Sequence, residues 1–142
     1  AKDMYDAVIE RADSMDIIVK AAAVADYRPK NVSSEKVKKQ DGNMSIELER
    51  TDDILKTLGE RKNGQFICGF SMETENMLEN SRKKLEKKNC DMIVANNLKQ
   101  DGAGFGGNTN IVTLITKDDE VQLEKMTKDE VAEKIFDFIL SR

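Results

Sequence analysis

The sequence predicts an α/β fold, a three-layer αβα arrangement around a mainly parallel sheet, followed by a C-terminal antiparallel hairpin and a terminal helix. Three short apolar runs, DIIVKAAAV, QFICGFSM and CDMIVANNL, alternate with helical patterns, an order typical of strand–helix–strand units. Behind them, NIVTLIT and EVQLEKM are joined by the charged KDD, which is typical of a hairpin. The 142 residues fit one domain.

The chain opens on a helical pattern and then a buried strand. Met4, Val8, Ala12 and Met15 recur at near-helical spacing, which predicts a helix with one apolar stripe. The run that begins at Asp16 suits a strand covered on both faces. The start is abrupt and carries no signal peptide, which suggests a cut in a longer domain.

A half-buried strand and a capped helix are expected next. SIELER alternates Ile46 and Leu48 with polar residues, which predicts a strand with one buried face. Thr51 is a suitable N-cap for the helix in DDILKTLGERK, and Asp52 and Asp53 would lie at its positive end.

Two further helices are predicted by their apolar faces. In ETENMLENSRKKLEKK, Leu78, Ser81 and Leu85 are expected to face the core. Near the C-terminus, Thr127 and Glu130 have the spacing of a capping box. The helix that this box opens places four apolar residues on one face: Val131, Ile135, Phe138 and Ile139.

Composition excludes several classes of protein. A formal net charge of −4 argues against broad binding to nucleic acid, which needs a basic face. No apolar run approaches the ~20 residues that span a bilayer, so no membrane insertion is expected. The absence of histidine excludes an imidazole base. Cys68 and Cys90 each lie in an apolar run, which indicates reduced core thiols in a cytoplasmic protein.

The stretch AAAVADYRP ends the first predicted strand with unusually small residues. Ala21, Ala22 and Ala23 would leave room for a ligand at the carboxyl edge of the sheet, where open α/β sheets bind ligands. Tight packing under a helix explains them equally well. Asp26 follows where the strand enters solvent, in a suitable place to accept hydrogen bonds from ribose hydroxyls.

Lysines occur in two places that suit an anion. Lys36, Lys38 and Lys39 follow in EKVKK; they form either a solvated face or a flap that stabilises charge on a phosphate. Lys84 and Lys88 are one helical turn apart. They could simply complement the helix dipole, and in a simple βαβ unit that helix end points away from the carboxyl edge of the sheet.

A glycine-rich stretch, DGAGFGGNTN, precedes the predicted hairpin. Its glycines are Gly102, Gly104, Gly106 and Gly107. It lacks the lysine and hydroxyl arrangement of a P-loop, and it precedes a strand rather than a helix. A tight turn or a mobile lid is the better interpretation.

Five motifs in this order resemble the synthetase domain of the phosphopantothenoylcysteine synthetase family. They are AAAVADYRP followed by EKVKK, TDDIL, GFSMET, KLEKKNCDMIVAN and GAGFGGNTNIVTLI, and together they cover nearly the whole chain. The resemblance implies a Rossmann-like fold. Such domains are commonly fused behind a flavin-dependent decarboxylase, so FMN is expected only in a fused domain and not in this chain.

The activity that the resemblance implies is CTP-dependent ligation of cysteine to 4'-phosphopantothenate in coenzyme A biosynthesis. The substrate carboxylate attacks the α-phosphate of CTP, and cysteine then displaces CMP from the acyl cytidylate. Such a site mainly positions reactants and neutralises charge. Mg²⁺ is expected to accompany the triphosphate, and no protein metal site is expected.

The resemblance also assigns residues. Lys36 corresponds to the flap lysine that forms the acyl cytidylate and is the expected catalytic residue. The positions expected to bind nucleotide are Ala21, Ala22, Ala23, Asp26, Lys36, Thr51, Asp52, Asp53, Ile54, Phe70, Lys84 and Lys88.

The chain departs from the family pattern at several positions. The family's NPDI is TDDI here, its GFAAET is GFSMET, and an acid common before TN is Asn108. The family's glycine-rich and asparagine-containing N-terminal motifs would precede Ala1. The resemblance therefore implies that residues 1–142 are a single domain, the larger C-terminal part of a synthetase domain whose N-terminal glycine-rich segment is absent, and that this chain binds nucleotide better than it catalyses. The family is dimeric, and the free edges of the hairpin from Ile111 to Leu123 predict a homodimer joined partly there.

Two alternative functions stay open at this point. A noncatalytic nucleotide-binding or regulatory module of the same fold would bind nucleotide without ligation. A nicotinamide oxidoreductase is suggested only by the α/β pattern, and the sequence has no intact GxGxxG between a strand and a helix.

Overall fold

A computed structural model describes residues 1–39, 41–73, 75–97 and 107–142. Its four helices are α1 (Lys2–Ala12), α2 (Ile54–Arg61), α3 (Met77–Lys87) and α4 (Lys128–Leu140). The nine strands in the described residues are β1 (Ile17–Lys20), β2 (Tyr27–Pro29), β3 (Leu48–Arg50), β4 (Phe66–Glu73), β5 (Met92–Asn97), β6 (Thr109–Asn110), β7 (Val112–Ile115), β8 (Glu120–Gln122) and β9 (Met126–Thr127).

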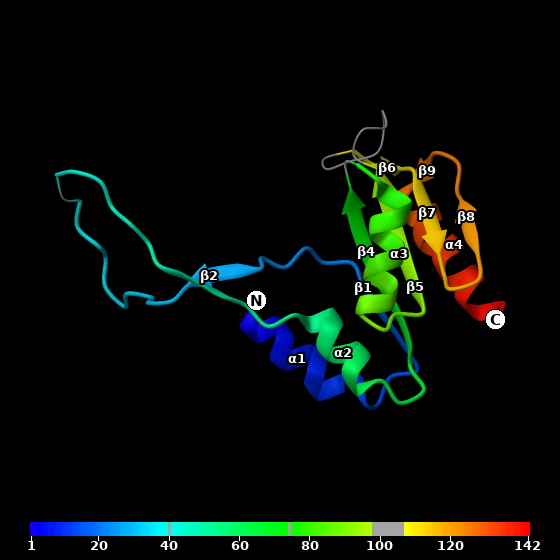
Figure 1. Ribbon diagram of the computed structural model, residues 1–142, viewed down its shortest axis with the longest axis horizontal. Helices are drawn as coiled ribbons and strands as arrows, with labels where there is room; N and C mark the ends of the chain where they lie inside the picture. Colours follow the sequence, from blue (N-terminus) through cyan, green and yellow to red (C-terminus); the bar gives the residue numbers. More distant parts are fainter. Residues whose placement is uncertain (40, 74, 98–106) are drawn as a thin grey trace.

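The main sheet has five strands in the order β1-β4-β5-β7-β8. The pairs β1–β4 and β4–β5 are parallel, whereas β7 pairs antiparallel with both β5 and β8. Strands β6 and β9 form a separate antiparallel pair that leads into α4. The predicted α/β fold with its C-terminal hairpin and terminal helix is therefore confirmed (Figure 1).

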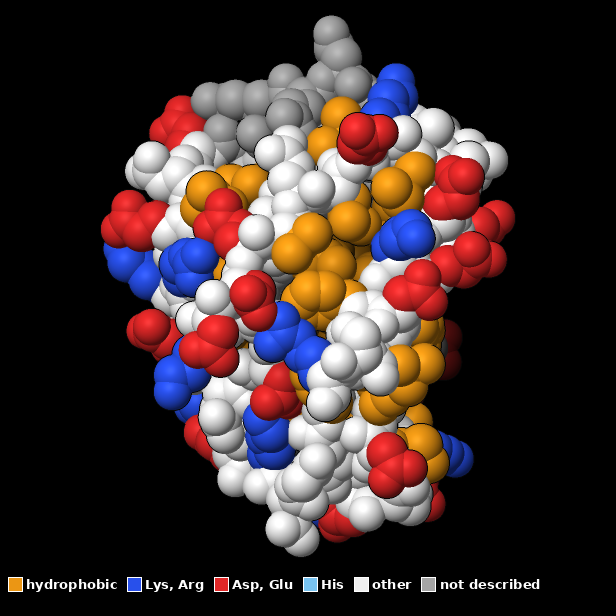
Figure 2. All heavy atoms as spheres, turned by 90° about the vertical axis from the view of Figure 1, so that its right-hand side faces the viewer, with side chains coloured by type: hydrophobic (Ala, Val, Ile, Leu, Met, Phe, Trp, Pro, Cys, Tyr) orange, Lys and Arg blue, Asp and Glu red, His pale blue; other side chains and the backbone are white. Residues whose placement is uncertain are grey.

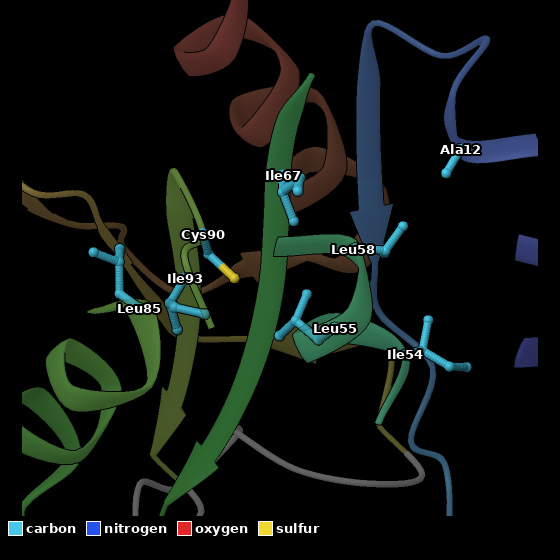
Figure 3. Packing of buried hydrophobic residues seen from close by; sticks show 8 residues of the cluster. All are labelled: Ala12, Ile54, Leu55, Leu58, Ile67, Leu85, Cys90 and Ile93. Atoms are coloured by element: carbon cyan, nitrogen blue, oxygen red, sulfur yellow. The ribbon is translucent and has the colours of Figure 1, made fainter. Parts of the chain in front are cut away.

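The sheet is the middle of three layers. On one face, residues of α1, α2 and α3 pack on β4 and β5, and Figure 3 shows Leu55, Ile67 and Ile93 among the side chains of this core. On the other face, Val131 and Ile135 of α4 pack against the opposite sides of the same strands. Strands buried on both faces explain the continuous apolar runs in the sequence.

A two-stranded arm projects from this body. Strands β2 and β3 pair antiparallel with each other and with no strand of the main sheet, and the chain between them extends away from the helices (Figure 1). Ion pairs between Arg28 and Glu49 and between Lys30 and Glu47 join its two sides, each with N···O of 2.7 Å.

The arm corrects one prediction from the sequence. Residues Ile46 and Leu48 are 58% and 55% exposed, so the predicted buried face of SIELER is wrong. Only its last three residues form a strand, and their partner is β2, not the core sheet. Alternation of apolar and polar residues predicts a strand, but it does not predict whether the core of the protein covers its apolar face.

Three smaller predictions are also wrong. Thr51 does not cap α2; the N-cap is Asp53, whose carboxylate accepts from the Lys56 N–H at 3.0 Å. Leu78 is 38% exposed although Ser81 and Leu85 of the same helix are buried. Met15 lies beyond the end of α1 and is 46% exposed.

The C-terminal helix begins as predicted. The Thr127 hydroxyl accepts from the Glu130 N–H, and the Glu130 carboxylate accepts from the Thr127 N–H at 2.7 Å. This capping box satisfies donors that the first helical turn leaves free. The predicted turn or lid at Gly102 to Gly106 lies outside the described residues.

Candidate functional site

A cavity of about 400 Å³ lies at the carboxyl end of β1. We call it the carboxyl-end cavity. Its wall includes every residue predicted to bind nucleotide except one: Ala21, Ala22, Ala23, Asp26, Thr51, Asp52, Asp53, Ile54, Phe70, Lys84 and Lys88. The three alanines therefore lie where a ligand can approach the backbone.

The unequal lengths of two neighbouring strands create this cavity. Strand β1 ends at Lys20, which is paired with Gly69, whereas β4 continues to Glu73. Within the described residues, β4 has no strand paired to it on the side of β1 from Phe70 onward, and Phe70 and Met72 of this stretch line the cavity. The Lys84 ammonium reaches the Phe70 carbonyl in β4, and Lys84 and Lys88 both line the cavity. This removes the geometric objection to Lys84 and Lys88.

A close approach between two helix ends positions Lys88. A Cβ on Gly59 of α2 would lie only 1.8 Å from the Lys88 carbonyl oxygen, so only glycine permits this approach. The Asn89 side-chain amide donates to the Gly59 carbonyl at 2.9 Å. Lys88 thereby comes beside the first turn of α2, where its ammonium donates to Asp53.

Asp53 combines two roles at the start of α2. Burial raises the pKa of its carboxyl, but hydrogen bonds from Lys88 and from the Lys56 N–H outweigh burial and hold that pKa below its ordinary value. The carboxylate therefore stays charged, caps the helix and holds Lys88 against the cavity.

Thr51 connects the two loops that line the cavity. Its hydroxyl donates to the Ala25 carbonyl at 2.6 Å, and its N–H donates to the Asp26 carbonyl at 3.0 Å. These bonds fix the segment after β1 against the segment before α2. Thr51 thus supports the cavity wall instead of capping the helix.

Lys84 and Lys20 differ from Lys88 in their partners. The Lys84 ammonium donates to the Phe70 carbonyl at 2.9 Å, and the Lys20 ammonium donates to the Ala22 carbonyl at 2.9 Å. Lys20 lines the cavity, although the sequence did not identify it as a site residue. The available signal was that it is the one charged residue inside the apolar run from Ile17 to Ala25.

The predicted catalytic lysine lies apart from the other residues. Lys36 is exposed on the arm and does not line the carboxyl-end cavity. The structure therefore gathers the predicted binding residues on the body and leaves Lys36 on a separate element. Its closure over the cavity stays a prediction.

Another cavity, of about 480 Å³, lies at the opposite end of the sheet. We call it the amino-end cavity, because it adjoins the starts of β4 and β5 near Phe66 and Asp91. Its wall also carries Lys62, Arg82 and Arg142. Each is paired with a carboxylate: Lys62 with Asp91, Arg82 with Glu120 and Arg142 with Asp119. It is the larger of the two cavities, and these three cations are each paired with a carboxylate, whereas Lys117, which also lines it, is exposed.

The chemistry of the carboxyl-end cavity is that of an anion-binding site. Ammonium groups, an acidic helix cap and small residues surround a space open to the backbone. Ammonium groups in such a space can position and neutralise phosphates.

The two cysteines take no part in this cavity. Burial raises the pKa of Cys68 to about 12 and that of Cys90 to about 11, and both thiols are buried as predicted. Neither thiol is a nucleophile at neutral pH.

The described ranges, which leave out residues 40, 74 and 98–106, contain no group of three or more His, Cys, Asp or Glu side chains that could hold a metal ion. No helix in these ranges has the length and apolar character needed to cross a membrane.

Known proteins resemble this chain in sequence and in structure. It is 55% identical over 118 residues to the coenzyme A biosynthesis bifunctional protein CoaBC of Bacillus subtilis, which covers 83% of this chain and 29% of that protein. A crystal structure of the C-terminal domain of a CoaBC matches 98% of this chain and 60% of that one, with 46% identity and a TM-score of 0.78.

A more distant structure shares the fold. A mutant of Cab2 in complex with phosphopantothenate-cysteine matches 87% of this chain and 51% of that one, with 20% identity and a TM-score of 0.60. The chain spans less than half the length of the B. subtilis relative. The sequence model of one family matches residues 1–142 in full, and the chain belongs to that family, the DNA/pantothenate metabolism flavoprotein C-terminal domain.

Proposed function

We propose that this chain carries the nucleotide site of a ligase that joins cysteine to 4'-phosphopantothenate at the expense of CTP. One observation carries the proposal: all predicted nucleotide-binding residues except Lys36, among them Lys84 and Lys88, line one cavity that is also lined by Lys20. The names of the relatives place them in coenzyme A biosynthesis, and the Cab2 structure holds phosphopantothenate-cysteine, the product of such a ligation.

The proposed reaction has two steps. An oxygen of the phosphopantothenate carboxylate attacks the α-phosphorus of CTP, and the bond from that phosphorus to pyrophosphate breaks. The cysteine amine then attacks the acyl carbon, the bond to the CMP oxygen breaks, and the amine proton passes to solvent. A carboxylate is a poor acyl donor, and CMP supplies the leaving group. Mg²⁺ accompanies the triphosphate as part of the substrate.

Individual residues receive roles from their positions. Lys84 and Lys88 on α3 bind phosphate oxygens, because charge-assisted hydrogen bonds to phosphate are strong. Asp26 accepts hydrogen bonds from the ribose, and the three alanines leave space for the nucleotide. Lys36 stabilises charge on the α-phosphate when the arm closes. The arm is a flexible carrier for such a group, because its exposed strands make few contacts with the body.

We also propose a homodimer in the cytoplasm, with a decarboxylase that binds FMN as a possible fused partner. Figure 2 shows hydrophobic side chains gathered in a strip on the face at the right of Figure 1, which carries β8 and α4. The exposed large hydrophobic residues of these elements are Val121, Phe136 and Leu140. A second copy of the chain could cover them, consistent with the interface predicted at the hairpin.

Nucleotide binding tests the first part of the proposal. Calorimetric titration of the chain with CTP and, separately, ATP, each with Mg²⁺, should give selective binding of CTP. Equal binding of both would contradict the assigned nucleotide, and binding of neither would contradict a nucleotide site formed by these residues.

The role of Lys36 needs a protein that can complete the reaction. In a full-length bifunctional protein with this chain as its C-terminal part, Lys36→Ala should lower the rate of pyrophosphate release by about 10²-fold or more, the scale of losing one transition-state donor, with little change in CTP affinity. Lys38→Ala, on the same arm, is the matched control. If the full-length protein binds CTP but forms no amide, the chain is a noncatalytic nucleotide-binding module instead.

A further inference from the structure

Lys20 is the cavity lysine to which neither the sequence nor the resemblance assigned a role. It is the last residue of β1 and lies on the same face of the sheet as Ile18, the face that α2 and α3 cover. Its side chain lines the carboxyl-end cavity together with Lys84 and Lys88. Three ammonium groups from two separate elements thus converge on one space.

The three ammonium groups are not equally neutralised. Lys88 pairs with the Asp53 carboxylate. Lys20 and Lys84 donate instead to the neutral carbonyls of Ala22 and Phe70, and within the described residues neither has a carboxylate within ion-pair distance. Two positive charges in the cavity therefore lack a direct counter-charge.

These two charges also act on each other. The pKa of the Lys20 ammonium is lowered, first by burial and then by the charge of Lys84. The more distant carboxylates of Asp53 and Asp26 oppose this effect only in part. An anion between the two ammonium groups would relieve the repulsion and replace the water that burial removed.

We propose that Lys20 is a third phosphate-binding lysine, which binds the polyphosphate chain of the nucleotide together with Lys84. This inference rests on the proposed function and adds a residue to it. The carbonyl of Ala22 holds the Lys20 ammonium at the cavity wall until a phosphate oxygen replaces it. Because the lysine stem is flexible, this exchange needs no movement of the backbone.

Calorimetry on three single variants tests the proposal with two ligands, CTP with Mg²⁺ and inorganic tripolyphosphate. Lys20→Gln removes the charge and should weaken both ligands by about ten- to a hundredfold, the scale of a charge-assisted hydrogen bond. Lys20→Arg keeps the charge. On a logarithmic scale, its loss of affinity for both ligands should be less than half of the loss in Lys20→Gln. Lys134→Gln, in an exposed i,i+3 pair on α4, is the control and should bind as the unchanged chain does.

A second readout separates binding from mere structural support. The pKa of Lys20, followed by NMR of the labelled ammonium, should rise when tripolyphosphate binds, whereas a structural lysine would not respond. Circular dichroism of Lys20→Gln checks that the variant is folded.

The outcomes distinguish this inference from the proposed function. Equal CTP affinities for the unchanged chain and Lys20→Gln would overturn the role of Lys20 and leave the nucleotide site intact. Tripolyphosphate binding that depends on Lys20, without any preference for CTP over ATP, would support Lys20 and overturn the assigned nucleotide. Absence of binding of either ligand to the unchanged chain would overturn both.

Discussion

The two cavities at opposite ends of the sheet have similar sizes and similar side chains but different charge balance. The amino-end cavity measures about 480 Å³ and the carboxyl-end cavity about 400 Å³. In the first, Lys62, Arg82 and Arg142 each contact a carboxylate. In the second, the partners change: among the described residues, Lys20 donates to the Ala22 carbonyl and Lys84 to the Phe70 carbonyl, and neither pairs with a carboxylate. Cavity size therefore does not separate the two cavities. The difference lies in the part-buried pair Lys20 and Lys84, which donate to carbonyl oxygens, whereas the remaining cation of the amino-end cavity, Lys117, is exposed.

The difference has a structural origin. Lys62, Arg82 and Arg142 face acidic residues just before β5 and around the turn between β7 and β8, so folding itself pairs these three. The carboxyl-end cavity exists because β1 stops before β4 does, and the backbone it uncovers offers carbonyl groups instead of carboxylates. Ion pairs in the first cavity contribute to the fold, and the charges in the second are available to a ligand.

The largest expected effect is on ligand binding at the carboxyl-end cavity. Lys84→Gln removes an ammonium that has no carboxylate partner in the described part of the chain, and CTP affinity should fall by about ten- to a hundredfold, measured by calorimetry. Arg82→Gln, on the same helix but in the amino-end cavity, is the matched control and should keep its CTP affinity. Equal losses in both variants would show that the charge balance does not separate the cavities.

The next effect is on stability at the amino-end cavity. The Asp91 carboxylate pairs with Lys62 at 2.5 Å and accepts from the Ile67 N–H at 2.7 Å, and both partners of the ion pair are mostly buried. Asp91→Asn should lower the free energy of unfolding by about 2 kcal/mol, measured by urea denaturation, with CTP affinity unchanged. Loss of CTP binding in a folded Asp91→Asn variant would contradict the separation of roles.

The core of the fold could be predicted from the sequence, but the arm could not. The core sheet was predictable because Ile67, Ile93 and their neighbours lie in continuous apolar runs, a local pattern that sheets covered on both faces require. The arm was not predictable, because the partner of β3 is β2, about twenty residues earlier in the chain. No local sequence pattern distinguishes a strand that pairs in an arm from one that pairs in the core sheet.

The site shows the same division. The alanines and the lysines of α3 were predicted from motifs, but the position of Lys84 beside β4 depends on where β1 ends, which the pattern gives only to within a few residues. Lys20 was overlooked because its run looks like an ordinary buried strand. A single lysine in such a run signals a strand end that opens on a cavity.

A smaller effect is expected where helix capping and ligand binding share a residue. Asp53→Asn keeps a good N-cap but removes the charge that holds Lys88. Because the folded pKa of Asp53 is lowered, its contribution is present above the unfolded value of about 3.9 and is lost as pH falls through the folded pKa. At pH 7 the unchanged chain should be more stable by about 1 kcal/mol or less, and the two curves of unfolding free energy should converge below about pH 4. A difference that stays constant with pH would contradict the assigned charge.

The smallest expected effect belongs to a lysine of the amino-end cavity, and it compares the two cavities most directly. Lys117 lines the amino-end cavity at the turn between β7 and β8, where it is exposed. Lys117→Gln should change the free energy of unfolding by less than about 0.5 kcal/mol and leave the affinities for CTP and tripolyphosphate within twofold of the unchanged chain. Lys20→Gln, with the same change of charge at the other cavity, is the matched comparison in the same calorimetric titrations. If Lys117→Gln weakened tripolyphosphate as much as Lys20→Gln does, net charge alone would govern binding, and the uncompensated pair of lysines would have no special role. A loss confined to Lys20→Gln would mean that the convergence of Lys20 and Lys84 where β1 ends, and not a single positive charge beside a cavity, determines where the anion binds.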